Sequence, residues 1–341
     1  MSISTKDIAK IANVSQSTVS RCLNDSPMIS QKTKDKVKKI ADEYGFQFNA
    51  SAKSLKSNKT GSVGLIIPKK RGDFENIHFR AWQDSLMENL EQIGFDVIIS
   101  FFENHNTGQN NIMKLVRSKK VDALILLQPK LDEETMGFLE KTKIPYVFCK
   151  YFPDGCKAKN IDYIHVDQFE GGYLATSHLI RLGHRRIMTI TADFEGGEFE
   201  LRQQGYEAAL REHAIPVSHD FMLKGDGTFQ SGFDLITKNS SLINEITAVF
   251  ALNDAMAIGA ISALKELGFH VPDDIAVVGF DDIELGTYFH PYLTTVSQPT
   301  KEVAKITCDR LEMLMNPKDS WTSQKVTVPP KLIIRESCGS R

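Results

Sequence analysis

Apolar side chains recur at helical spacing near the start of the chain, and this pattern predicts a short first helix. Ile8, Ala9, Ile11 and Ala12 recur at the spacing of a helix with 3.6 residues per turn. Ser4 can cap the first turn, and Asp7, three residues later, completes an imperfect capping box. The segment is therefore expected to form an amphipathic helix that covers a small core.

A second and a third helix are expected directly after the first. Asn13 tolerates the left-handed conformation in which a helix ends. Ser15 can then cap a helix over residues 16–23, in which Val19 faces inward, and a further apolar periodicity predicts a helix over residues 30–44. Two short helices joined by three or four residues match a helix-turn-helix.

The outward face of the second helix carries side chains suited to DNA. Gln16 and Arg21 are of the types that reach adenine and guanine edges in the major groove. Ser17, Thr18 and Ser20 can donate hydrogen bonds to phosphates, which are also favoured at a helix N-terminus. An ordinary helical hairpin with a polar solvent face would show the same periodicity, so periodicity alone does not decide between the two interpretations.

From residue 61 onward the pattern changes to continuous apolar runs separated by amphipathic segments. Runs of this kind indicate parallel strands that helices cover on both faces, which predicts two doubly wound α/β units in tandem. The predicted strands are residues 61–68, 95–102, 121–129, 144–150, 161–167, 185–191, 246–252 and 275–280. The predicted helices between and after them are residues 82–93, 109–118, a segment ending at 182, 201–214, 255–267 and 300–315.

Several motifs together resemble the lactose/galactose repressor (LacI/GalR) family. V-S-x-S-T-V-S-R-x-L-N, I-S-x-x-T and N-A-x-A-K-S-L occur in the first sixty residues, and L-R-Q-Q-G-Y, N-D-A-M-A-I-G-A and V-V-G-F-D-D follow later. The resemblance implies a helix-turn-helix headpiece at residues 1–48 and a hinge helix with linker at 49–60. It further implies an effector-binding and dimerisation core at 61–341, similar to periplasmic sugar-binding proteins. Its N-subdomain is expected at about 61–162 and 293–321, and its C-subdomain at about 163–292 and 322–341.

The same resemblance assigns DNA contacts along the headpiece and hinge. In the family, two hinge helices pair on DNA and insert a leucine into the minor groove, a position that Leu55 matches. Alone, residues 49–57 are too short and too polar for a stable helix, so a frayed linker is the other interpretation. Phe48 departs from the family pattern, which usually has proline there. The expected contacts are Thr5, Ser15, Gln16, Ser17, Thr18, Ser20, Arg21, Asn24, Ala52, Leu55 and Lys56.

Polar residues at the carboxyl ends of the predicted strands are the candidates for an effector site, because ligands of open α/β sheets bind there. Carboxylates, an amide, a forked guanidinium and aromatic faces together suit a hydroxyl-rich ligand. The resemblance makes Arg202, Asn253 and Asp281 effector contacts. The full expected set is Phe74, Glu170, Arg202, Asn253, Phe280 and Asp281. A helix N-cap is the alternative for each acidic residue, and we expect that role for Asp254.

Charge is distributed unevenly along the chain. Residues 1–60 contain eleven Lys and Arg against five Asp and Glu, a net charge of +6, so the total of −2 leaves −8 on the remainder. A basic module on an acidic body is the pattern expected of a protein that binds phosphate at one end. The lysines of residues 32–39 are expected on a solvated face with some phosphate contact.

Other functional classes lack their motifs. The sequence contains neither G-x-G-x-x-G nor G-x-x-x-x-G-K-[ST], its five cysteines show no C-x-x-C spacing, and its histidines have no metal or triad spacing. His184 is expected to be structural. We therefore expect no enzyme activity, cofactor or metal, and the lack of a signal peptide or apolar span favours a cytoplasmic protein without membrane contact.

The sequence thus predicts a homodimeric transcriptional repressor whose affinity for operator DNA depends on a small molecule. Six residues follow Arg335, too few for the leucine-heptad extension that forms tetramers in some relatives. The expected effector is a sugar or sugar derivative. A purine, suggested by the likeness of F-E-G-G-Y at 169–173 to purine-repressor relatives, or a phosphoprotein corepressor are the alternatives. Whether the effector induces or co-represses stays open, and a solute-binding module or an enzyme is the rival of another class.

Overall fold

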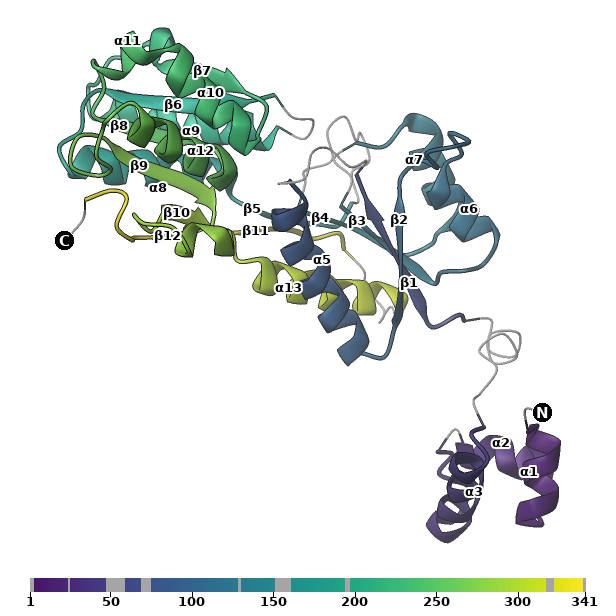
Figure 1. Ribbon diagram of the computed structural model, residues 1–341. Coiled ribbons are helices and arrows are strands. Elements are labelled where there is room, and N and C mark those ends of the chain that lie inside the picture. Colours follow the sequence, from purple (N-terminus) through teal and green to yellow (C-terminus); the bar gives the residue numbers. More distant parts are fainter. Residues whose placement is uncertain are drawn as a thin grey trace. The chain divides into compact units, whose positions relative to one another are not determined.

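The computed structural model describes residues 3–23, 25–46, 59–68, 75–127, 130–150, 161–193, 197–316 and 322–339. The chain divides into two compact units, Met1–Thr60 and Gly61–Arg341, which are drawn in Figure 1. This division agrees with the predicted start of the core. The predicted hinge at residues 49–57 lies outside the described residues, as does Phe48.

The described part of the first unit contains three helices. Its helices are α1 (Thr5–Ala12), α2 (Gln16–Leu23) and α3 (Gln31–Glu43). Ser4 and Asp7 form the capping box of α1, and Asn13 ends that helix with φ of 54°. Small and β-branched side chains from all three helices, among them Ala9 and Val19, close one apolar core. The predicted helix-turn-helix is confirmed.

The first subdomain of the second unit contains a six-stranded parallel sheet with strand order β11-β5-β4-β3-β1-β2. Helices α5 and α13 cover one face, while α6 and α7 cover the other. The strands are β1 (Ser62–Ile67), β2 (Asp96–Phe101), β3 (Ala123–Leu126), β4 (Tyr146–Cys149), β5 (Tyr163–Val166) and β11 (Lys325–Val328). The helices are α5 (Glu75–Gln92), α6 (Asn111–Arg117), α7 (Glu133–Thr142) and α13 (Thr300–Met315).

The second subdomain repeats this architecture with strand order β12-β10-β9-β8-β6-β7. Only β12 runs antiparallel to its neighbour among the described strands. The strands are β6 (Ile187–Ala192), β7 (Met222–Gly225), β8 (Ala248–Ala251), β9 (Ala276–Asp281), β10 (Thr294–Ser297) and β12 (Lys331–Ile333). The α-helices are α8 (Gln168–Arg181), α9 (Glu198–Glu212), α10 (Phe229–Lys238), α11 (Ser240–Ile243) and α12 (Asp254–Glu266), and two 3-10 turns are η1 (His219–Phe221) and η2 (Glu284–Thr287).

The chain crosses between the subdomains at other places than the sequence predicted. Strands β5 and β11 belong to the first sheet, and β10 belongs to the second. The crossings therefore follow Val166, Gln298 and Val328, rather than residues 162, 292 and 321. Apolar runs mark the strands themselves, but they do not show which sheet a strand joins, because that is decided by long-range pairing.

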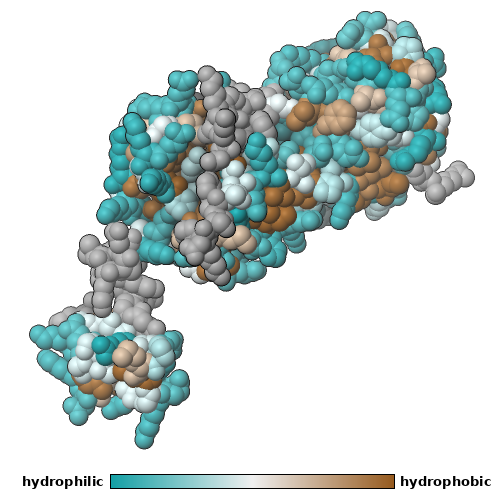
Figure 2. Space-filling view, turned by 180° about the vertical axis from the view of Figure 1, so that it is seen from behind, coloured by the Kyte–Doolittle hydropathy of each residue, from teal (hydrophilic) through white to brown (hydrophobic). Residues whose placement is uncertain are grey.

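The surface of the core is mixed. Figure 2 shows apolar side chains gathered in patches between polar stretches on the face that is visible there. No helix among the described residues is long and apolar enough to cross a membrane. The largest exposed aromatic side chains of the second subdomain are Tyr288 and Phe289, which are 64% and 59% exposed.

Candidate DNA-recognition face and effector site

The predicted recognition helix α2 presents its polar side chains to solvent. Gln16, Ser17 and Arg21 are exposed, whereas Ser20 is half-buried. Ser15 caps the helix, because its Oγ accepts a hydrogen bond from the Thr18 amide at 3.0 Å. The structure therefore leaves an exposed surface of glutamine, serine and arginine side chains, which suits the grooves and phosphates of a duplex.

A side-chain hydrogen bond connects the two helices of the motif. Gln16 Nε2 donates to Thr5 Oγ1 at 2.9 Å, so the first residues of α1 and α2 lie together. Both helix N-termini carry partial positive charge, which favours a phosphate nearby. Thr5 and Gln16 thus lie at these two N-termini, while Asn24, Ala52, Leu55 and Lys56 lie outside the described residues.

The lysines of α3 were expected on a solvated face, but three of them bind groups of the headpiece itself. Lys34 is buried and donates to the Asp25 carbonyl oxygen at 3.1 Å, while Lys36 donates to the Ala12 carbonyl oxygen at 2.9 Å. Lys38 forms an ion pair with Asp25 at 2.6 Å. Three of these lysines therefore hold the ends of the neighbouring helices, a role that charge alone does not reveal.

In the core, Arg202 is the centre of the candidate effector site. It lies on α9 and is only 2% exposed. Its Nε donates to Gln168 Oε1 at 2.8 Å, and its Nη1 donates to the Leu252 carbonyl oxygen at 2.5 Å. The guanidinium lies over the Phe280 ring at 3.7 Å from the centroid. These contacts fix the orientation of its fork.

Two glycines allow the approach of the helices that carry Arg202 and Gln168. A Cβ at Gly172 of α8 would lie 2.0 Å from the Arg202 carbonyl oxygen, and one at Gly205 of α9 would lie 2.1 Å from the Phe169 carbonyl oxygen. Such distances are impossible for any larger residue, so α8 and α9 cross with their backbones in contact. This crossing brings Gln168 within hydrogen-bonding reach of Arg202.

Four side chains form a closed ring of polar contacts. Gln168 Nε2 donates to Gln298 Oε1 at 3.1 Å, and Gln298 Nε2 donates to Asp281 Oδ1 at 2.8 Å. Asp281 Oδ1 lies 3.5 Å from Arg202 Nη2, which completes the ring. Gln168 and Gln298 stand next to two of the subdomain crossings. A displacement of Arg202 or Asp281 therefore also acts, through these glutamines, on the chain segments that cross between the subdomains.

Asp281 carries signs of a functional position. Its φ of 114° is a conformation that L-residues rarely adopt, and such strain gathers at binding sites. Burial raises the pKa of its carboxyl, and the nearby Arg202 and Lys150 cations act in the opposite direction. A carboxylate held in this way can accept hydrogen bonds from ligand hydroxyl or N–H groups.

One expected role at this site is wrong. Asn253, not Asp254, caps α12, since its Oδ1 accepts from the Met256 amide at 2.9 Å. Asp254 is fully buried and accepts hydrogen bonds from Thr295 and from the Ile283 amide. Sequence alone does not separate two adjacent capping residues, because either side chain can reach the third amide that follows it.

The remaining expected contacts have different surroundings. Phe280 is fully buried beneath Arg202, and its ring supports the guanidinium. Glu170 is half-buried in the first turn of α8, where the helix dipole favours a carboxylate. Phe74 lies outside the described residues. The predicted structural role of His184 agrees with its hydrogen bond to Thr247 at 3.0 Å.

Two charged residues of this region were missed by sequence reasoning. Lys150 follows β4 directly, and Glu198 begins α9. Their side chains form an ion pair of 2.6 Å. Lys150 ends an apolar run at the carboxyl end of a predicted strand, which is a usable signal for a site residue. No cluster of potential metal ligands occurs within the described ranges.

Comparison with known proteins gives a consistent result over the whole chain. Residues 4–49 match the model of bacterial regulatory proteins of the lacI family, and residues 176–338 match a periplasmic binding protein-like domain. The HTH-type transcriptional repressor PurR of Vibrio vulnificus is 33% identical over 340 residues, which cover 97% of each chain.

Solved structures of transcriptional regulators show the same architecture. The lac repressor dimer bound to operator and the anti-inducer ONPF has a TM-score of 0.80 and 25% identity, covering 99% of both chains. The complex of the transcriptional regulator CelR with cellobiose has a TM-score of 0.72 and 26% identity, covering 98% of this chain and 99% of that one.

Proposed function

Because the chain belongs to the LacI family of bacterial regulatory proteins, we propose that it is a homodimeric repressor that binds operator DNA through α2. A small molecule that binds at Arg202 and Asp281 is proposed to raise or lower the affinity of the protein for the operator. The observation that carries the effector assignment is the closed ring of Arg202, Gln168, Gln298 and Asp281. This ring connects the buried Arg202 and the strained, buried Asp281 to the two glutamines beside the subdomain crossings.

The ring explains how ligand binding reaches the DNA-binding unit. A ligand that bonds to Asp281 or Arg202 competes with the hydrogen bonds of Gln298 and Gln168. Since these glutamines adjoin two crossings, the relative orientation of the subdomains changes with the state of the ring. In a dimer, such a change alters the spacing of the two chains that lead to the headpieces, and so alters operator affinity.

A sugar or sugar derivative is the effector that we favour. The site combines a carboxylate acceptor with a guanidinium donor, and hydroxyl-rich ligands use both. The similar regulator CelR was solved with cellobiose, and a LacI-family regulator from Enterococcus faecium with ribose. A purine is the second candidate, because residues 169–173 are similar to those of purine-repressor relatives and the PurR of Vibrio vulnificus matches nearly the whole chain. A phosphoprotein corepressor remains a further alternative partner.

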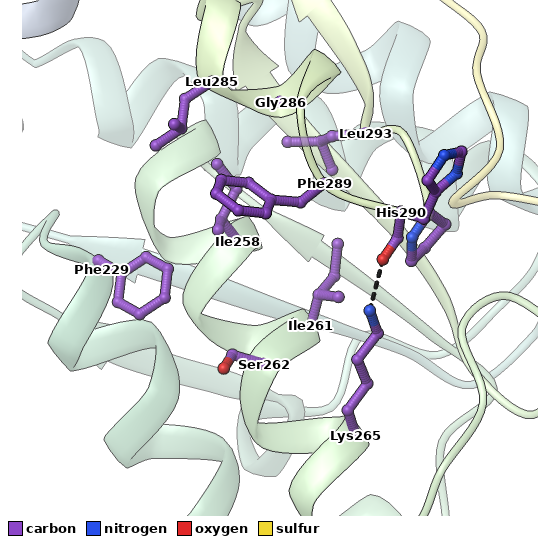
Figure 3. Close-up of a pocket in the computed structure, with 11 residues that line it drawn as sticks. Phe229, Ile258, Ile261, Ser262, Lys265, Leu285, Gly286, Phe289, His290 and Leu293 are labelled. Atoms are coloured by element: carbon purple, nitrogen blue, oxygen red, sulfur yellow. Dashed lines mark hydrogen bonds between the residues drawn. The ribbon is translucent and has the colours of Figure 1, made fainter.

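The second copy of the chain is proposed to dock on the second subdomain. A pocket of about 230 Å³ opens there between α10, α12 and the segment after η2. Figure 3 shows Phe229 and Phe289 beside Ile258 and Ile261, and the Lys265 ammonium donating to the His290 carbonyl oxygen. An exposed aromatic ring beside an apolar pocket, as Phe289 is here, is typical of protein interfaces. Phe289 is the residue that we expect at its centre.

A reciprocal experiment tests the two sites. Arg21→Ala is expected to lose specific operator binding but to retain the thermal shift given by the effector. Asp281→Asn is expected to retain operator binding in the absence of effector but to lose that shift. Sugars, sugar phosphates and nucleobases are screened on the unmodified protein first. If Asp281→Asn responds to the effector as the unmodified protein does, the effector site lies elsewhere.

A further inference from the structure

A buried ion pair joins the two subdomains of the core. Lys150 follows β4 of the first sheet, whereas Glu198 is the first residue of α9, which packs on the second sheet. Lys150 Nζ lies 2.6 Å from Glu198 Oε2, and the side chains are only 3% and 10% exposed. We propose that this pair is a latch, meaning a contact that holds the two subdomains together before any effector binds.

Each partner is positioned by its own subdomain. Lys150 has a φ of 76°, which is unusual for a residue with a Cβ, and its ammonium lies 5.1 Å from the centroid of the Phe79 ring on α5. Glu198 follows the N-cap Gly197, so its carboxylate lies where the dipole of α9 favours a negative charge. The two charges therefore face each other from separate supports.

Burial makes a partial opening of this contact unfavourable. An exposed ion pair contributes little, because water replaces each partner. Here both groups are desolvated, and removing either partner leaves an uncompensated buried charge. A movement that separates Lys150 from Glu198 before water reaches both groups is therefore opposed, whereas full hydration of both charges would offset the loss of the pair.

The latch adjoins the effector site. Glu198 and Arg202 are four residues apart on one face of α9, and Arg202 in turn lies beside Asp281. Positive and negative groups thus alternate from Lys150 to Asp281. Glu198 Oε1 is buried and has no hydrogen-bond partner among the described residues, so it offers an acceptor to a hydroxyl or N–H donor of a ligand.

The test measures the distance between the subdomains in the full-length protein without effector or DNA. Fluorophores are attached to unnatural amino acids at the exposed positions Glu140 and Glu245, one in each subdomain. Glu198→Gln and Lys150→Met each remove one charge with little change of shape. Lys305→Met is the matched control, because Lys305 pairs with Asp309 within the exposed face of a single helix.

Both latch variants are expected to lose part of the short-distance population, while Lys305→Met keeps the distribution of the unmodified protein. An unchanged distribution in Glu198→Gln and Lys150→Met overturns the proposal, and so does an equal shift in the control. Circular dichroism establishes that each variant is folded, and either latch variant alone suffices for the measurement. The distance measurement needs neither effector nor DNA, so its result stands or fails separately from the proposed function.

Discussion

Replacing Arg202 separates the electrostatic from the hydrogen-bonding contribution of the effector site. Arg202→Lys keeps the positive charge but loses the fork that reaches Gln168 and the Leu252 carbonyl group. A buried acceptor left without its donor costs about 1–3 kcal/mol, so we expect a loss of unfolding free energy in that range. Arg202→Met also removes the cation beside Asp281, and breaking a buried pair costs about 3–5 kcal/mol.

The difference between the two variants is expected to depend on pH. The pKa of Asp281 is raised by burial and lowered by Arg202, so Arg202→Met raises it further. A carboxyl whose folded-state pKa exceeds its unfolded-state value destabilises the protein as pH rises from the unfolded-state pKa to the folded-state pKa. The additional loss of unfolding free energy in Arg202→Met should therefore reach its full size at a pH above the folded-state pKa of Asp281. It should vanish at a pH below 3.8, the ordinary pKa of the carboxyl.

Urea unfolding of the full-length variants, followed by far-UV circular dichroism across a series of pH values, measures both contributions. The hydrogen-bonding loss is expected at every pH, since it does not involve a titrating group. Equal losses in Arg202→Lys and Arg202→Met throughout the series would show that Arg202 does not stabilise a buried Asp281 carboxylate. Asp309→Asn, at an exposed pair, is the control for a general effect of charge on unfolding.

Three further outcomes are expected. Arg21→Ala should weaken specific operator binding by about 1–3 kcal/mol, measured against competitor DNA, and equal weakening on non-specific DNA would contradict base recognition. Phe289→Asp should shift the dimer towards monomer in analytical ultracentrifugation, whereas an unaltered sedimentation profile would place the interface elsewhere. Burial, and then the Asp281 charge, raise the pKa of Asp254 well above its ordinary value. Asp254→Asn should therefore gain stability relative to the unmodified protein as pH rises above 3.8, on top of a pH-independent loss from the hydrogen bond of Thr295 or Ile283 that the amide cannot accept. A stability difference independent of pH would refute an ionisable Asp254.

Local structure was readable from the sequence where short-range rules determine it. The bounds of α2 agree with the prediction, because Ser15 and the spacing of Val19 and Cys22 act within one or two turns. The apolar runs likewise located most strands of both sheets, since parallel strands are buried on both faces. Strands β7, β10, β11 and β12 were not predicted, because none of them contains more than two consecutive apolar side chains.

Features that depend on tertiary contacts were not readable in the same way. The burial of Lys34 and Phe280 is decided by neighbours distant in sequence, and so is the pairing of Lys150 with Glu198. The polar ring is a further example, because Gln168 and Gln298 are 130 residues apart. Types of residue at strand ends indicated where a site would form, but packing decided which of them support it and which remain available to a ligand.

The three crossings restrict how the core can deform. β5 and β11 are paired up to Val166 and Val328, immediately before both chains leave the first sheet, and the third crossing follows Gln298. Because β5 and β11 pair within the first sheet, the two crossings that follow them stay side by side, and a change in the orientation of the subdomains falls on the few residues between the sheets. Bending is thereby the favoured movement of the core, and Pro329 and Pro330, which fix their own φ angles, leave the crossing after Val328 less free to rotate than the one after Val166.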